Sequence, residues 1–158
     1  MNPATRSAAR IVDFFDRRAV DYNHAYGHET TAGYALRVRR KKVLELFDRP
    51  GGVVLDVGCG PGIMAEEMLA RGCQFYGIDP AETMISIAQE RYGGSARFLL
   101  GDAARLPFAN GFFDAVICTG VVDSLVDGSQ AVGEMVRVLK PDGTFIISFA
   151  NLTSPYAW

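Results

Sequence analysis

Val53-Val54-Leu55-Asp56-Val57-Gly58-Cys59-Gly60-Pro61-Gly62 is the most informative segment of this 158-residue chain. Its first half is a short apolar run that follows two glycines, as expected of a strand buried in a parallel sheet. Its second half holds three glycines, which let the backbone turn sharply and let a ligand approach without meeting a Cβ atom. A strand, a glycine-rich loop and then a helix form the place where open α/β sheets bind their ligands.

Outward from this stretch, apolar runs of strand length alternate with segments of helical periodicity. Further strands are expected over residues 74–78, 96–100, 113–118 and 144–149, with helices over about 62–71, 81–92 and 128–139. Two more helices, over about 7–22 and 31–47, precede the first strand. The alternation predicts an α/β fold, a doubly wound parallel sheet with helices on both faces. We expect one domain, in which residues 1–50 form a helical cap and residues 51–158 form the ligand-binding core.

Composition and charge argue against several classes of protein. The net charge is −2, whereas a nucleic-acid partner normally requires a basic face. No apolar run approaches the ~20 residues that span a membrane. The odd number of cysteines, without a C-x-x-C pair, predicts buried thiols in the cytoplasm. The one cationic cluster is interpreted as the solvated face of a helix; it consists of Arg37, Arg39, Arg40, Lys41 and Lys42.

Acidic residues stand at or just after the ends of the first three predicted strands. Asp56 precedes the glycines and suits a positively charged ligand. Asp79 is placed to accept both hydroxyls of a ribose, although the same residue can instead cap the following helix. Asp102 is placed to accept from the exocyclic amine of an adenine, or simply stabilises a turn. Because the carboxyl ends of parallel strands meet at one edge, we expect one nucleotide-binding crevice there.

The spacing of the glycines disfavours a dinucleotide. Their pattern is G-x-G-x-G, and Ile63 stands where the dinucleotide fingerprint carries its third glycine. Asp56 would also be poorly placed against a pyrophosphate. An NAD-dependent oxidoreductase is therefore a less favoured alternative. An aminopropyl transferase is another, although the loop after the fourth strand offers only Asp123 and the more distant Asp127 to grip a polyamine.

Together these motifs resemble those of the class I, Rossmann-like S-adenosylmethionine-dependent methyltransferases. The subgroup is the one that acts on small molecules, similar to ubiquinone and menaquinone methyltransferases. The stretches that carry the resemblance are Leu55–Gly62, Gly77–Asp79, Gly101–Ala103, Phe113–Val116 and Arg137–Gly143. The resemblance implies the strand order 3-2-1-4-5, S-adenosylmethionine as the cofactor, and in-line methyl transfer to a small-molecule acceptor.

The resemblance also assigns cofactor contacts to individual residues. Asp56 would lie near the amino group of the cofactor, Asp79 would hold the ribose hydroxyls, and Thr119 would offer its carbonyl to the amino group. Tyr22 would reach the carboxylate from the N-terminal segment. The loop backbone would pass beneath the methionine and ribose parts, through Gly58, Cys59, Gly60 and Gly62. The adenine would meet Asp102 and Ala103, with Pro80 and Met84 packed near its ring.

Methyl transfer from a sulfonium depends mainly on holding the nucleophile in line, and a base helps only if the nucleophile must lose a proton. Family members often carry histidines or other polar residues just after strand four, where this chain has Asp123. We predict that Asp123 faces the acceptor and binds or deprotonates it; the alternative is a helix-capping residue. No metal site is expected, because His24 and His28 lack a third ligand.

The family fold usually adds a sixth and a seventh strand, which the nine residues after Phe149 cannot supply. The fifth strand would then be an open edge that invites pairing with a second copy of the chain. It contains Phe145, Ile146 and Ile147. A cofactor-binding chain without catalysis is therefore an alternative to an active methyltransferase.

Overall fold

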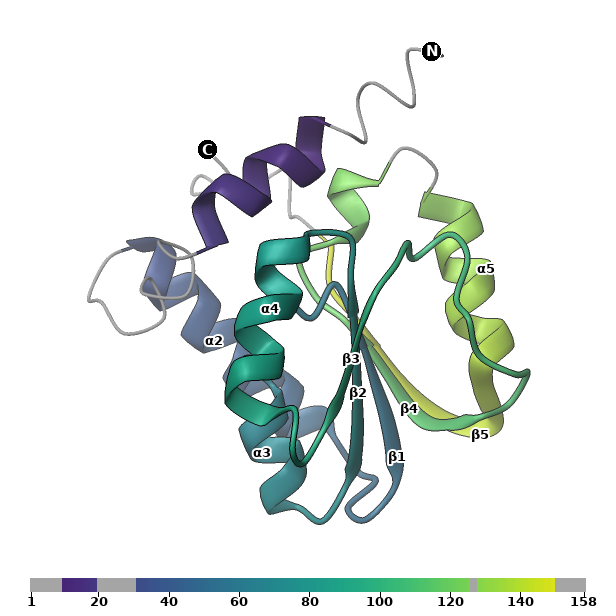
Figure 1. The fold of residues 1–158 in the computed structure, drawn as a ribbon. Helices are drawn as coiled ribbons and strands as arrows, with labels where there is room; N and C mark the ends of the chain where they lie inside the picture. The colour runs from purple at the N-terminus through teal and green to yellow at the C-terminus, as the bar shows by residue number, and fades with distance from the viewer. Residues whose placement is uncertain (1–9, 20–30, 126–127, 150–158) are drawn as a thin grey trace.

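The computed structural model describes residues 10–19, 31–125 and 128–149, and its centre is a five-stranded, all-parallel sheet (Figure 1). The strand order is β3-β2-β1-β4-β5. This confirms the predicted fold class and order, with the glycine-flanked strand at the centre. The strands are β1 (Val53–Val57), β2 (Gln74–Asp79), β3 (Arg97–Leu100), β4 (Phe113–Cys118) and β5 (Leu139–Ile147).

Helices cover both faces of the sheet. On one side lie α2, α3 and α4, and on the other lies α5 (Figure 1). A further helix, residues 10–19, is drawn in purple beyond the carboxyl ends of the strands (Figure 1). The labelled helices are α2 (Thr31–Leu46), α3 (Ala65–Ala70), α4 (Glu82–Tyr92), the 3-10 helix η1 (Val122–Ser124) and α5 (Gly128–Val138).

Two apolar clusters fill the space between the sheet and its helices. Val54 belongs to the cluster that includes Val43 of α2 and Met68 of α3. Leu55, the next residue of β1, belongs to the opposite cluster with Met135 of α5. Successive side chains of a strand point to opposite faces, so a strand covered on both faces is apolar throughout. This explains the apolar residues Val53, Val54 and Leu55 at the start of the glycine-flanked strand.

The beginnings of α3 and β5 differ from the sequence-based expectation. The helix expected from residue 62 begins at Ala65, because Gly62 adopts a φ of 78°, outside the helical region. The strand expected from residue 144 begins at Leu139 and runs through Pro141. Since β5 is an edge strand, a proline costs it no ladder hydrogen bond on its free side. The pairing of β4 with β5 is irregular between Phe113 and Ala115.

Asp114 joins the beginnings of three strands. Its Oδ2 accepts a hydrogen bond from the Val53 N–H at 2.8 Å, and its Oδ1 lies 2.6 Å from Nζ of Lys140. The hydrogen bond from Lys140 is the main cause that lowers the pKa of Asp114. The amino ends of β1, β4 and β5 are thus held together, at the end of the sheet opposite the glycine loop. Within the described ranges, no helix is both long and apolar enough to cross a membrane.

Candidate functional site

The glycine loop after β1 is fixed by backbone hydrogen bonds to β2. The N–H groups of Gly58 and Cys59 donate to the carbonyl of Ile78 at 2.8 and 3.1 Å. Gly58 has a φ of 73°, and a Cβ atom placed on it would overlap Cγ2 of Val121. Only glycine fits both demands. The loop therefore packs directly against the segment that follows β4.

Asp79 fastens the same loop to the beginning of α4. Its Oδ2 accepts from the Gly60 N–H and its Oδ1 from the Ala81 N–H, both at 2.9 Å. Asp79 is 9% exposed, and burial raises its pKa while the two N–H donors act in the opposite direction. The N-cap position of α4 is occupied by Ala81, so Asp79 is not the helix cap itself. A carboxylate offers about four lone pairs, and each oxygen keeps acceptor capacity for a further hydroxyl.

Asp56 lies at the end of β1 and is 4% exposed. In contrast to Asp79, its carboxylate accepts no hydrogen bond from any residue in the described part of the chain. Burial, and then the neighbouring charge of Asp79, raise the pKa of Asp56 to about 7. A buried carboxylate without donors is costly when ionised, and a cation beside it removes that cost. The position suits a positively charged group of a ligand.

Open space lies beside Gly60. A Cβ atom placed there would meet only Sδ of Met84, at 3.9 Å. Met84 is 2% exposed and packs with Ala81 against Ala19 of the N-terminal helix. That helix is fixed to α4 by a hydrogen bond from the Thr83 N–H to Oδ1 of Asp16, 2.7 Å long. The helix of residues 10–19 therefore lies beside the edge of the sheet that carries the glycine loop (Figure 1).

The rest of the glycine loop serves packing. The Sγ atom of Cys59 is buried, and a Cβ atom on Gly77 would lie 2.7 Å from it, so only the Cys59 backbone can meet a ligand. Burial raises the pKa of this thiol. The N–H of Gly62 donates to the carbonyl of Cys59 at 3.1 Å. A Cβ atom on Gly62 would lie 3.2–3.3 Å from three side chains, so this glycine allows close packing of the loop on α4 and β3.

Asp102 forms the turn that the sequence offered as its alternative interpretation. Its side chain is exposed, and Oδ1 accepts from the Ala104 N–H at 2.9 Å. Ala103 beside it is buried in the cluster on the α5 side, whereas Pro80 is exposed. Arg137 of α5 holds the continuing loop through its carbonyls, donating to Leu106 at 2.9 Å and to Phe108 at 2.8 Å. Contact of Asp102 with adenine stays a prediction.

The segment after β4 contains two of the predicted residues. Thr119 is partly buried, and the N–H of the next residue, Gly120, donates to Oγ of Ser148 at 2.9 Å. Asp123 is exposed on η1. Tyr22, His24 and His28 lie outside the described residues.

The sequence analysis did not predict that a cationic side chain lies at the carboxyl ends of the strands. A Cβ atom on Gly120 would overlap Nη1 of Arg39, so the guanidinium of α2 lies against the segment after β4. The cationic cluster is thus not a uniformly solvated face, since Arg40 also forms an ion pair with Glu67 of α3. Arg39 and Gly120 are 81 residues apart in the sequence. No local pattern indicates which face of the helix contacts which loop, so this contact could not be predicted.

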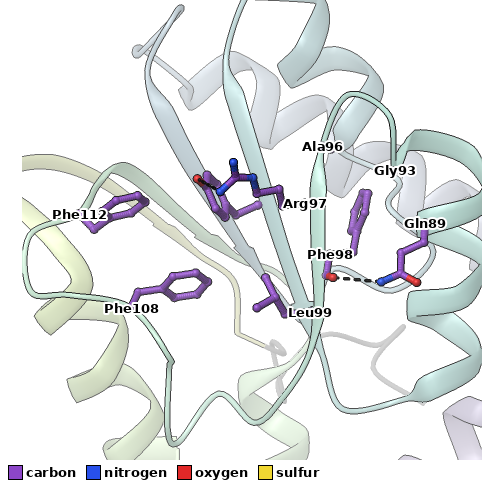
Figure 2. Close-up of a pocket in the computed structure, with 9 residues that line it drawn as sticks. Gln89, Gly93, Ala96, Arg97, Phe98, Leu99, Phe108 and Phe112 are labelled. Atoms are coloured by element: carbon purple, nitrogen blue, oxygen red, sulfur yellow. Dashed lines mark hydrogen bonds between the residues drawn. The ribbon is translucent and has the colours of Figure 1, made fainter.

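A hollow of about 690 Å³ lies elsewhere, at the edge strand β3 (Figure 2). Phe108 and Phe112 lie on one side of β3, and Gln89 lies on the other (Figure 2). On that second side, Nε2 of Gln89 donates a hydrogen bond to the carbonyl of Phe98 at 3.2 Å. None of the predicted cofactor residues lines this hollow. It is therefore separate from the glycine-loop site.

Comparisons with known proteins agree with this geometry. The methyltransferase domain family matches residues 55–147. A demethylmenaquinone methyltransferase of Thermus thermophilus is 36% identical over 120 residues, which are 73% of this chain and 54% of the relative. A ubiquinone/menaquinone biosynthesis C-methyltransferase of Geotalea daltonii is 30% identical over 151 residues, 90% of this chain and 64% of the relative.

A solved structure shares the fold at lower identity. The magnesium protoporphyrin IX methyltransferase of Synechocystis, with bound S-adenosylmethionine, has a TM-score of 0.71 at 22% identity. The match covers 88% of this chain and 74% of that one. The present chain spans only about half to two thirds of the length of the two curated relatives. Because the family profile covers more than half of the chain and contains the glycine loop, the chain belongs to the methyltransferase domain family of S-adenosylmethionine-dependent enzymes.

Proposed function

We propose that this chain is an S-adenosylmethionine-dependent methyltransferase that transfers the methyl group in line to a small molecule. The observation that carries the proposal is Asp56, a buried carboxylate without a hydrogen-bond donor in the described part of the chain, which neighbours the Asp79 that holds the Gly60 N–H. S-adenosylmethionine carries an ammonium and a sulfonium, and a buried acid at this point favours such a cationic ligand over a pyrophosphate. Membership of the methyltransferase domain family supports the same conclusion.

The residues present fit the cofactor from its amino-acid end to its adenine. We assign the amino group to Asp56 and the carbonyl of Thr119, and the ribose hydroxyls to the remaining lone pairs of Asp79. The buried side chain of Met84 offers an apolar surface for the adenine ring, and so does Ala103. When bound, the cofactor supplies a methyl group that its sulfonium has already activated. The protein then has to orient the acceptor and exclude water from the reacting atoms.

Asp123 is the residue that we assign to the acceptor. It stands three residues after Gly120, in the segment whose Val121 packs on the glycine loop. A carboxylate at this position could bind the acceptor, or take its proton where the nucleophile is a hydroxyl. The variant Asp123→Asn tests the assignment. It should lower the rate of methyl transfer while leaving the affinity for S-adenosylhomocysteine unchanged, and equal rates would refute it.

The acceptor class is proposed from the relatives. The enzymes of Thermus and Geotalea are methyltransferases of menaquinone and ubiquinone/menaquinone biosynthesis. Small quinols and phenols are therefore the first acceptors to assay, followed by amines and carboxylic acids. The net charge of −2 favours a small molecule over a nucleic acid, which normally requires a basic face.

Two experiments in sequence test the function. Calorimetry should show binding of S-adenosylmethionine and S-adenosylhomocysteine but not of NAD; binding of NAD alone would refute the proposal and favour an oxidoreductase. A transfer assay with methyl-labelled cofactor should then label a member of the acceptor panel. Binding without any transfer would instead select a cofactor-binding chain that does not catalyse.

We also propose a homodimer in the cytoplasm, formed through the open edge of β5. Unpaired backbone groups of an edge strand pair readily with another chain. Phe149, which follows this strand, is 63% exposed, and β5 lies at the end of the sheet order. Sedimentation of the chain at high micromolar concentration should show a dimer, and a clean monomer would contradict this assembly.

A further inference from the structure

The hollow at β3 has a wall of aromatic rings on one side of the strand (Figure 2). The rings of Phe108 and Phe112 are parallel to within 13°, and their centroids are 6.4 Å apart. Phe113 is fully buried and lies nearly perpendicular to both rings, at centroid distances of 4.8 and 4.9 Å. Nη1 of Arg137 donates to the carbonyl of Phe108 and holds the loop as well. The wall is therefore fixed in place before any ligand binds.

Part of this aromatic wall faces solvent. Phe112 is 40% exposed, and Phe108 is only partly buried. Aromatic rings that face open space can stack on another planar ring, which adds to the gain from burying their surface. The volume of about 690 Å³ lies within the range of roughly 300–1,000 Å³ that small-molecule sites occupy. Size and lining thus suit a small planar molecule.

Arg97 is the only charged residue among the described residues that line the hollow. Its side chain lies on the same side of β3 as Phe108 and Phe112 (Figure 2). Nη1 of Arg97 donates to Oη of Tyr76 at 3.3 Å, and its Cζ lies 5.5 Å from the centroid of the Tyr76 ring. Arg97 forms no ion pair with any described residue. Because a guanidinium has five N–H donors in a planar fork, the others are left for an acid.

The free edge of β3 is already partly occupied, which favours a small molecule over a strand of another chain. The N–H of Gly101 donates to the carbonyl of Asp79 in β2 at 3.0 Å, and backbone groups alternate between the two edges of a strand. The carbonyl of Phe98 therefore points to the free edge, where Nε2 of Gln89 donates to it. A pairing strand would have to displace this side chain.

We propose that the hollow at β3 is a second ligand site, which binds a small planar aromatic molecule that carries a carboxylate. The aromatic part stacks on Phe108 or Phe112, and the carboxylate accepts hydrogen bonds from Arg97. None of the residues assigned to the cofactor lines this hollow. The inference therefore goes beyond the proposed methyl transfer and does not depend on it.

The test compares 2-naphthoate with its neutral amide, 2-naphthamide, which shares the ring system and lacks the charge. Fluorescence titration should show that 2-naphthoate binds about 10-fold more tightly, as expected for one charged hydrogen-bond pair. Arg97→Gln should remove this preference by weakening 2-naphthoate about 10-fold, while the affinity for 2-naphthamide stays within about twofold. Phe112→Ala should weaken both probes by about 3- to 10-fold, because both lose the same stacking surface.

The matched control is Arg105→Gln, which removes an exposed positive charge from the loop after β3, outside the lining of the hollow. It should leave both affinities unchanged. Saturation with S-adenosylhomocysteine should not displace 2-naphthoate; displacement would place the probe in the cofactor site and overturn the inference. Equal binding of the two probes by the parent chain, or a preference retained in Arg97→Gln, would overturn it too. A chain that shows the Arg97-dependent preference but binds no S-adenosylhomocysteine would refute only the proposed function.

Discussion

Asp56 and Asp79 end neighbouring strands, are both buried and both have raised pKa values, yet they differ in what they bind. Asp79 accepts two backbone N–H groups and thereby fixes the loop to α4. Asp56 accepts none from the described residues. Asp79 therefore holds the loop of the site in place, whereas the carboxylate of Asp56 is left for a ligand. Because both pKa values are raised, asparagine relieves the cost of burying a charge at both positions, but at Asp79 it also leaves a backbone N–H without its acceptor. We therefore expect the substitution to stabilise the protein at Asp56 and to destabilise it at Asp79.

The largest effect is expected from Asp79→Asn. An amide has one acceptor oxygen, so one of the two N–H groups, of Gly60 or Ala81, loses its partner. An unsatisfied buried donor costs about 1–3 kcal/mol, and the ribose loses an acceptor as well. We expect lower stability at pH 7 and binding of S-adenosylhomocysteine weakened about 100-fold or more, measured by denaturant unfolding and calorimetry. An Asp79→Asn chain as stable as its parent would contradict the structural role assigned to Asp79.

Asp56→Asn should instead stabilise the protein without ligand. The carboxyl of Asp56 loses its proton near pH 4 in the unfolded chain and at about pH 7 in the folded one. Between these values the folded state binds more protons, so stability falls as pH rises, and asparagine removes this loss. The variant should be more stable than its parent by roughly 2–4 kcal/mol at pH 8 and equal to it near pH 3. Unfolding by urea at both pH values measures the difference, and a gain of the same size at both would contradict the titration of Asp56.

A third expectation concerns protons released on binding. An ammonium placed beside Asp56 favours the ionised carboxylate, so S-adenosylhomocysteine should displace a fraction of a proton near pH 6.5. Calorimetry in buffers of different ionisation enthalpy gives this number directly. Asp56→Asn provides the control, because it has no proton to lose at this position. Equal proton release by parent and variant would assign the release to another group.

The smallest effect is expected at Asp102, an exposed acid at the end of the third strand. In Asp102→Asn the amide oxygen can still accept from the Ala104 N–H and from an adenine amine. Stability should change by less than about 1 kcal/mol, and affinity for S-adenosylhomocysteine by less than about threefold. A loss as large as that of Asp79→Asn would show that the negative charge itself matters at this strand end.

Sequence patterns predicted the local parts of the molecule well. The apolar run before Asp56 predicted a buried strand, and the alternation of strands and helices predicted the parallel sheet. The strand order came from the resemblance to the methyltransferases. The limits appeared where tertiary contacts decide the outcome. β5 begins at Leu139 because residues there pair with β4 at Phe113, which no local signal in Pro141 or Gly143 reveals.

The candidate site, too, could be predicted from the sequence only in its local parts. The glycines and the acids could be found from sequence, because their spacing follows the strand ends. Whether Asp79 accepts hydrogen bonds and Asp56 does not depends on the path of the loop, which the spacing does not fix. Arg39 was invisible for a related reason, since the contact with Gly120 depends on how α2 is rotated against the sheet.

The central place of β1 also has a consequence for how the chain is made. One edge of β1 pairs with β2, which follows soon after it, but the other edge pairs with β4, which ends at Cys118. At a synthesis rate of 5–20 residues per second, the ribosome needs about 3–12 s to proceed from Val57 to Cys118. During that interval a strand that the finished fold buries on both faces has an unpaired edge, which is a target for chaperones or for other nascent chains. Slow codons between β2 and β4 would lengthen this exposure, whereas those placed after β5 would not.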